Sequence, residues 1–273
     1  MKARLAILSV VVLIGVSFFY SCGANLFSID QDVQLGKDMD NQIKADPAGY
    51  PPLTGHEDVK SYVSGVGKSI VNSTNLIQYK NVFPYQFTVI NDTIINAFCT
   101  PGGYIYVYTG LLKFIDNEAT LAGVLAHEIA HAENRHTTKR ITSYYGVSLA
   151  LNVVLGNNPN TLADIMSNLF VGLGFLANSR SDEKEADDYS IKYLAAGGKY
   201  YPGAIKYFFY KIKDEQQRLG QNPGAIDRLL STHPLAQDRI DNVFSKLREY
   251  NVTSDSTKGL YIQEYQFEKA KLP

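Results

Sequence analysis

His127-Glu128-Ile129-Ala130-His131 lies inside a run of small and apolar residues, 118–133, that predicts a buried helix. Residues four positions apart lie one turn above each other on the same face of a helix, so the two imidazoles can share one metal ion. Glu128 projects beside them, where it can reach a water on that metal. Because the flanking residues are apolar, these polar groups need partners from elsewhere in the chain. The stretch therefore predicts a metal site inside the fold.

A hydrolytic zinc site needs a third protein ligand, with one position left open for water. One known pattern places a third histidine six residues after the second, but position 137 is a threonine. His136 lies about half a turn around the helix from His127, so we do not expect it to share the ion. The third ligand must come from another segment.

The stretch from Ser179 to Asp187 can supply that ligand. It predicts a helix on which Glu183 and Asp187 lie on one face. Glu183 can be the carboxylate ligand, and Asp187 can accept the outer N–H of a ligand histidine and fix its tautomer. Alone, the stretch is equally typical of a solvated helix start, where carboxylates favour the helix dipole. The upstream motif favours the metal interpretation.

Composition narrows the class of protein. The chain has 273 residues and a formal net charge of −1. That length is enough for one sizeable core. The sequence contains no basic run or stripe, which argues against a nucleic-acid partner.

The N-terminus has the pattern of an export signal. Lys2 and Arg4 precede an apolar stretch, 5–20, that is short for a membrane span and suits a signal peptide. Ser21-Cys22-Gly23 follows and looks like a bacterial lipoprotein cleavage box, which implies a lipid on Cys22. A plain signal peptide or an uncleaved anchor is the alternative. The second cysteine, Cys99, then has no intrachain partner and is expected to be a small buried hydrophobe.

The fold class expected is α+β and predominantly helical, with a small sheet ahead of the metal helix. Further helices are predicted at residues 29–44, 56–73, 111–115, 179–196, 202–218 and 235–250, and strands at 85–91 and 104–108. Two apolar pieces, 147–155 and 165–176, are short for bilayer spans. We expect buried helices or a flap over the site there, with a membrane-dipping hairpin as the alternative.

The expected organisation is a signal peptide (1–21), a lipid-anchor linker (22–28), one catalytic domain (29–250) and a C-terminal tail (251–273). Strand 104–108 follows a Pro-Gly-Gly turn. If it lies at a sheet edge, it can align an extended peptide by strand addition, which makes Gly103, Tyr104, Ile105 and Tyr106 candidate substrate-binding residues. An ordinary interior strand is the alternative.

Three groups of residues together resemble one known family: the 127–131 motif, the block from Ser179-Arg180 to Ala186-Asp187, and Ser231-Thr232-His233-Pro234 with Arg239. Over residues 29–250 the chain is similar to the zinc metallopeptidases that include HtpX, the CAAX prenyl protease and periplasmic BepA. That resemblance implies a zincin-like fold of the gluzincin type. Clear transmembrane helices within the domain are lacking here, so the compact soluble members are the nearer likeness.

The resemblance implies that His127, His131 and Glu183 bind one Zn²⁺ and that Glu128 is the general base. Asp187 matches a family residue that orients a ligand or donates a proton, and we expect the orienting role. His233 matches a family histidine near the metal, which steadies the oxyanion or caps the metal in a resting state.

The function expected is zinc-dependent hydrolysis of peptide bonds in unfolded or misassembled envelope proteins. The enzyme would act on the periplasmic side, anchored through Cys22, in the outer membrane rather than the inner. The alternative is a latent or inactive lipoprotein chaperone or assembly factor on the same fold. Loss of the base or a ligand would indicate that class, and all four residues are present.

Overall fold

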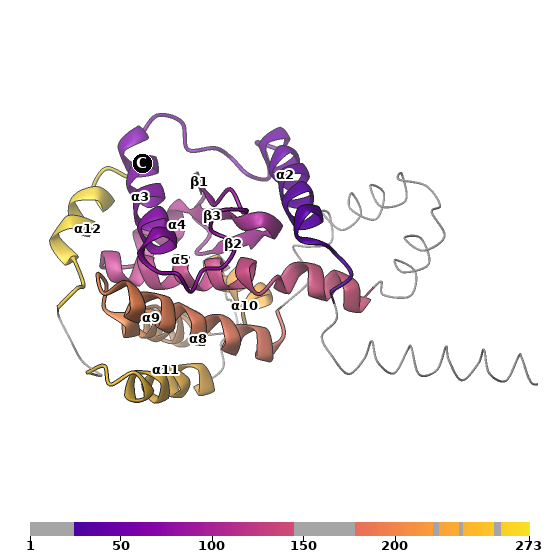
Figure 1. The fold of residues 1–273 in the computed structure, drawn as a ribbon. Helices are drawn as coiled ribbons and strands as arrows, with labels where there is room; N and C mark the ends of the chain where they lie inside the picture. Colours follow the sequence, from indigo (N-terminus) through magenta and orange to yellow (C-terminus); the bar gives the residue numbers. More distant parts are fainter. Residues whose placement is uncertain (1–24, 145–177, 221–223, 235–236, 254–257) are drawn as a thin grey trace, which may run out of the picture.

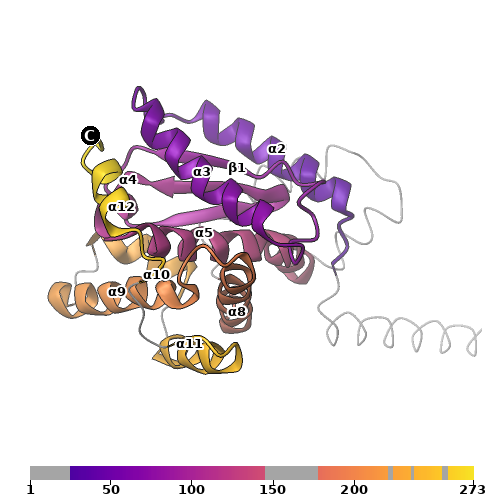
Figure 2. The same ribbon diagram turned by 60° about the vertical axis from the view of Figure 1, so that its left-hand side comes forward.

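A three-stranded sheet lies between two groups of helices (Figures 1 and 2). The computed structural model describes residues 25–144, 178–220, 224–234, 237–253 and 258–273. The expected signal peptide, Cys22 and the two apolar pieces 147–155 and 165–176 lie outside these residues. Within the described part of the chain, no helix is both long enough and apolar enough to cross a bilayer.

The sheet has the strand order β1-β3-β2, with β1 at Gln86–Ile90, β2 at Ala97–Thr100 and β3 at Tyr104–Tyr108. β3 pairs in parallel with β1 and antiparallel with β2. Its alternating aromatic and β-branched residues are all buried, as suits a strand covered on both faces. The predicted strand is confirmed, but the edge-strand alternative is wrong because β3 is paired along both sides.

Helix α5, Glu118–Glu133, lies against the sheet on the face opposite helices α2 and α3 (Figure 2). Asn117 caps its N-terminus, where the side-chain oxygen accepts a hydrogen bond from the backbone N–H of Thr120. All of its residues are buried, so the sequence expectation of a buried metal-motif helix is confirmed. Helices α8, α9 and α11 lie on the side of α5 that faces away from the sheet.

The remaining helices match the predicted ranges closely, except that the helix at 227–232 and the 3-10 form of the short turns were not predicted. They are α2 (Ile29–Ala45), α3 (Glu57–Ser73), α4 (Thr109–Phe114), α8 (Arg180–Gly197), α9 (Ile205–Leu219), α10 (Asp227–Thr232) and α11 (Gln237–Glu249), with short 3-10 turns at Pro101–Gly103, Pro202–Ala204 and Gly224–Ile226. Ser179 caps α8 in a reciprocal capping box with Asp182. Gly198 ends the helix in the left-handed conformation that glycine adopts without strain.

Packed structure extends beyond both ends of the expected catalytic domain. Residues 25–28 were expected as a linker, yet Phe27 is buried and the Asn25 amide donates to Thr138. The expected tail contains helix α12, Ile262–Lys269, which packs near α3. Its Tyr265 is buried and donates a hydrogen bond to the Leu112 carbonyl. These contacts join both segments to the same packed body.

A buried carboxylate anchors the C-terminal end of α5. Glu133 accepts hydrogen bonds from the backbone N–H groups of Gln78 and Tyr79 and from the hydroxyl of Tyr85. Burial raises the pKa of Glu133 although these donors oppose the shift. The contact ties the loop before β1 to the helix that carries the metal motif.

Gly36 marks a close approach between α2 and the turn that leads into β3. A Cβ at this position would collide with the backbone carbonyl of Pro101 and touch the Tyr104 ring. We predict that Gly36→Ala lowers the melting temperature by roughly 3–10 °C, because the backbone of the turn must move to make room. Thermal unfolding followed by circular dichroism measures this.

Gly65 gives the matched control, because it lies on the exposed face of α3 and a Cβ there would meet nothing within 4 Å. Gly65→Ala should leave the melting temperature unchanged or raise it, since alanine is the better helix former by about 1 kcal/mol. Equal melting temperatures for the two variants would contradict the packing described here.

Candidate metal centre

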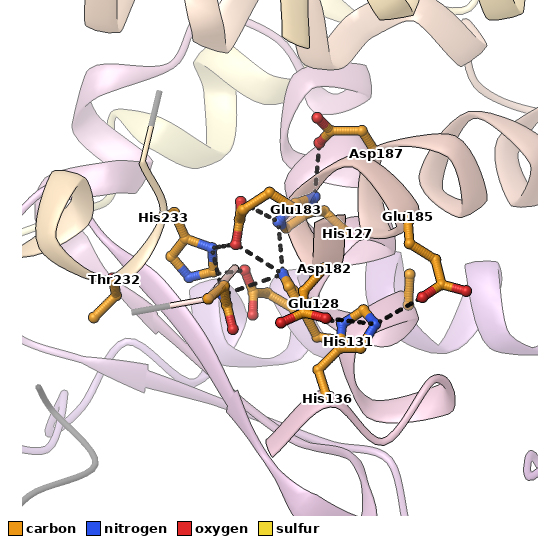
Figure 3. Close-up of polar contacts among 12 residues, drawn as sticks. His127, Glu128, His131, His136, Asp182, Glu183, Glu185, Asp187, Thr232 and His233 are labelled. Carbon is orange, nitrogen blue, oxygen red and sulfur yellow. Dashed lines mark hydrogen bonds and ion pairs between the residues drawn. The ribbon is translucent and has the colours of Figure 1, made fainter. Parts of the chain in front are cut away.

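Three elements bring four buried side chains to one point (Figure 3). His127 and His131 come from α5, Glu183 from α8, and His233 follows the last residue of α10. One potential ligand atom from each lies within 4.8 Å of all the others. The i, i+4 spacing on α5 turns both imidazoles toward α8, as the sequence predicted.

The separations fit a single ion. The Nε2 atoms of His127 and His131 lie 3.0 Å apart. Nε2 of His127 lies 3.4 Å from Oε2 of Glu183, and Nε2 of His131 lies 3.3 Å from Oε1 of the same carboxylate. Two nitrogens that bind one tetrahedral zinc at its usual bond length are about 3.3 Å apart. The residues present therefore suit a metal ion held between α5 and α8.

Glu128 carries an oxygen that the protein leaves free. Its Oε2 atom is buried and has no hydrogen-bond partner in the part of the chain that the structure describes. Its Oε1 atom lies 3.8 Å from Nε2 of His233. A buried carboxylate oxygen without a donor is costly, so a ligand or water is expected to complete it.

Asp187 lies behind His127, where the sequence predicted an orienting carboxylate. Its Oδ1 atom is 2.9 Å from Nδ1 of His127. Arg239 donates two hydrogen bonds of 2.8 Å to the same carboxylate, and its Nη1 atom lies 2.7 Å from Glu183. Burial alone would raise the pKa of Asp187, but the charge of Arg239 and the contact with His127 lower it.

The two histidines of the motif differ in their electrostatics. Burial alone would lower the pKa of His127, but the carboxylates of Asp187 and Glu183 raise it to about 9. Burial and the neighbouring charge of His127 hold the pKa of His131 well below its usual range. The two carboxylates therefore favour the protonated form of His127. A metal that binds there must displace that proton.

His136 is outside this group of four potential metal ligands, as the sequence predicted, but it contacts one of them. Its Nδ1 atom lies 2.7 Å from Nδ1 of His131, and its Nε2 atom lies 3.1 Å from Glu185. Sequence reasoning missed this contact because it continued one helix through residue 136. The helix instead ends at Glu133, and Arg135 takes a positive φ of 57°, so residue 136 does not have the orientation that an unbroken helix would give it.

His233 lies among the four potential metal ligands, where the family resemblance implied it. Its Nδ1 atom is 2.9 Å from Oε1 of Glu183. The amide nitrogen of Asn178 lies 3.2 Å from the same Nδ1 atom and 3.4 Å from Nε2 of His131. Asn178 was not identified from the sequence, because it directly precedes the Ser179 cap and reads as a loop residue.

A hollow that is partly open to solvent lies over the centre. Glu128 and His131 line it together with β2 and the residue before it, through Asn96, Phe98, Cys99 and Thr100. Gly103, Tyr104, Ile105 and Tyr106 do not line it, because β3 lies one strand further into the sheet. The assignment of substrate contacts to those four residues therefore needs correction: the strand that borders the site is β2.

Comparison with known proteins agrees with this geometry. The sequence profile of peptidase family M48 matches residues 58–246, a range that contains all four potential metal ligands. The β-barrel assembly-enhancing protease of Yersinia pestis is 28% identical over 263 residues, which are 92% of this chain and 50% of the relative.

Two other relatives extend the comparison. The β-barrel assembly-enhancing protease of Escherichia coli (strain K12) is 29% identical over 252 residues, or 89% of this chain and 49% of the relative. The mitochondrial metalloendopeptidase OMA1 of Schizosaccharomyces pombe is 29% identical over 234 residues, which are 85% of this chain and 66% of the relative. The chain spans about half the length of the two bacterial relatives. With a profile match over more than half of its length, the chain belongs to peptidase family M48.

Proposed function

We propose that the chain is a zinc-dependent endopeptidase that cuts unfolded or extended polypeptides of the bacterial cell envelope. One observation carries the proposal: two imidazoles and a carboxylate converge beside Glu128, whose buried Oε2 atom has no partner among the described residues. The names of the relatives, which are proteases and metalloendopeptidases, support the same class of reaction. One Zn²⁺ ion per chain would be held by His127, His131 and Glu183.

Zinc, when bound, would acidify a water molecule and polarise the scissile carbonyl. Glu128 takes the proton of the attacking water and passes it to the leaving amine, the role of a general base and acid. Asp187 holds His127 in the tautomer that presents Nε2 to the ion, and Arg239 holds Asp187. Burial of the whole cluster strengthens each of these interactions.

The edge of β2 is the proposed guide for an extended substrate. Among the described strands, β2 pairs with β3 alone, and its residues border the hollow beside Glu128. A peptide that adds to this edge is held by its backbone, with little demand on side chains. That mode of binding favours unfolded polypeptides, because folded proteins rarely offer a free extended segment.

His233 has two candidate roles at the centre. We propose that it caps the metal in a resting state, since its ring lies inside the cluster of potential ligands. The other role, as a donor to the oxyanion, needs the ring to point at the substrate carbonyl. A capped metal would make the enzyme latent until the histidine moves.

The proposed location is the periplasmic face of a membrane, with a lipid on Cys22 and the outer membrane favoured. It rests on the order of features at the N-terminus, where two basic residues are followed by an apolar stretch and then by Ser21-Cys22-Gly23. A latent or inactive assembly factor on the same fold is the second candidate, and the position of His233 is the observation that favours latency.

His136 has a proposed role that follows from where protons must lie. A histidine that binds a metal through Nε2 carries its proton on Nδ1. The Nδ1 proton of His131 therefore points at Nδ1 of His136, 2.7 Å away, which has to accept it. The proton of His136 then lies on Nε2, where it faces Glu185 at 3.1 Å. His136 relays the orienting effect of a carboxylate to His131.

We predict that Glu128→Gln reduces cleavage of an unfolded protein by at least about a hundredfold, because an amide cannot take the proton. Zinc content, measured by elemental analysis, should stay at that of the wild type. Glu57→Gln, the same change at an exposed position of α3, should leave activity unaltered. Full activity in Glu128→Gln would refute the mechanism.

His136→Ala should weaken zinc binding about tenfold to a hundredfold, since His131 loses the group that fixes its tautomer. His136→Asn should recover most of that affinity, because its Oδ1 atom can accept the same proton. Competition with a chromogenic chelator measures the affinity, and His56→Asn, far from the site, is the control. A wild-type affinity for His136→Ala would exclude the relay.

His233→Ala distinguishes capping from oxyanion stabilisation. If the histidine caps the metal, cleavage of an unfolded protein should rise several-fold, because the position for substrate becomes free. Loss of an oxyanion donor would instead lower kcat about a hundredfold or more. Steady-state kinetics of the zinc-loaded variant decide between the two, and a fall of that size would overturn the resting-state proposal.

A further inference from the structure

The hollow over the metal centre is lined by two guanidinium groups with different surroundings. Arg228, from α10, lies over the rings of Tyr50 and Tyr108, at 5.6 Å and 5.9 Å from their centroids. Arg140, in the helical segment 136–144, has buried Nε and Nη1 atoms that find no hydrogen-bond partner among the described residues. Glu128 is the one acidic residue among the described residues that line this hollow.

Two other arginines near the centre, Arg239 and Arg135, have carboxylate partners. Arg239 pairs with Asp187, and Arg135 pairs with Asp32 and also donates to the Phe27 carbonyl. For Arg140, no carboxylate of the described residues lies within ion-pair distance. Burial lowers the pKa of Arg140, although the more distant charge of Asp182 opposes this. The group still cannot lose its proton near neutral pH, so it remains a cation with two buried nitrogens, Nε and Nη1.

A buried cation without a partner is unfavourable, and truly unsatisfied buried donors are rare in native proteins. An anion that enters the hollow would satisfy Arg140. The planar fork of a guanidinium matches the two oxygens of a carboxylate, which it can bind through parallel hydrogen bonds. Glu128 lines the same hollow, so a substrate that reaches Glu128 can bring its own anion close to Arg140.

We infer that Arg140 binds a carboxylate of the polypeptide substrate close to the scissile bond. This inference rests on the proposed function and names the substrate feature that the same site selects. The carboxylate belongs either to an aspartate or glutamate side chain or to the C-terminus of the polypeptide. Arg140 thereby gives a backbone-reading site a preference for one chemical group.

The test uses the zinc-loaded full chain and quenched fluorescent peptides in matched pairs. One set replaces glutamate by glutamine at each position in turn, and the other compares a free C-terminus with its amide. The wild type should cut the carboxylate member of at least one pair about tenfold to a hundredfold faster. Arg140→Gln should remove that preference, Arg140→Lys should keep part of it, and Arg228→Gln should retain it.

Binding to zinc-loaded Glu128→Gln, followed by fluorescence anisotropy with the same peptides, separates this inference from the proposed function. A carboxylate preference in binding that Arg140→Gln removes supports the inference even if no peptide is cut. Cleavage without any carboxylate preference overturns the inference and leaves the peptidase intact. A preference that persists in Arg140→Gln, or that moves with Arg228→Gln, also overturns it. Melting temperature and zinc content confirm that each variant is folded.

Discussion

The complete burial of α5 is the constraint on which the rest of the structure depends. This helix carries five ionisable side chains into the core: Glu118, His127, Glu128, His131 and Glu133. Each needs a partner, because an isolated buried charge is too costly to keep. Tyrosine hydroxyls, a lysine and backbone N–H groups satisfy the two terminal glutamates. The partners of His127 and His131 come mainly from α8, whose position opposite α5 is where a metal centre can form.

The centre itself joins two helices that use the same spacing. His127 and His131 lie one turn apart on α5, and Glu183 and Asp187 lie one turn apart on α8. One carboxylate faces both inner nitrogens, and the other lies behind the first histidine. Two buried carboxylates so close would repel each other, but Arg239 contacts both. This arginine makes the acidic pair tolerable, and the proposed metal ion would add to its effect.

Much of this was predictable from sequence, because helix periodicity and capping are local. The buried helix of 118–133, the acidic helix after Ser179 and the sheet ahead of the metal helix are confirmed. The central position of β3 in the sheet was not predictable, since strand pairing depends on contacts between distant segments. The contact of His136 with His131 was missed because α5 ends at Glu133 and Arg135 takes a positive φ, so the helix does not continue unbroken. Arg140 was missed because the lack of a partner for its guanidinium can be seen only once its neighbours are placed.

The central claim is that one zinc ion joins α5 to α8. Anomalous scattering at the zinc absorption edge, recorded from crystals of the zinc-loaded chain, tests it most directly. We predict one peak about 2.0–2.2 Å from Nε2 of His127, from Nε2 of His131 and from a carboxylate oxygen of Glu183. A peak that excludes Glu183, or no peak between the two helices, would contradict it.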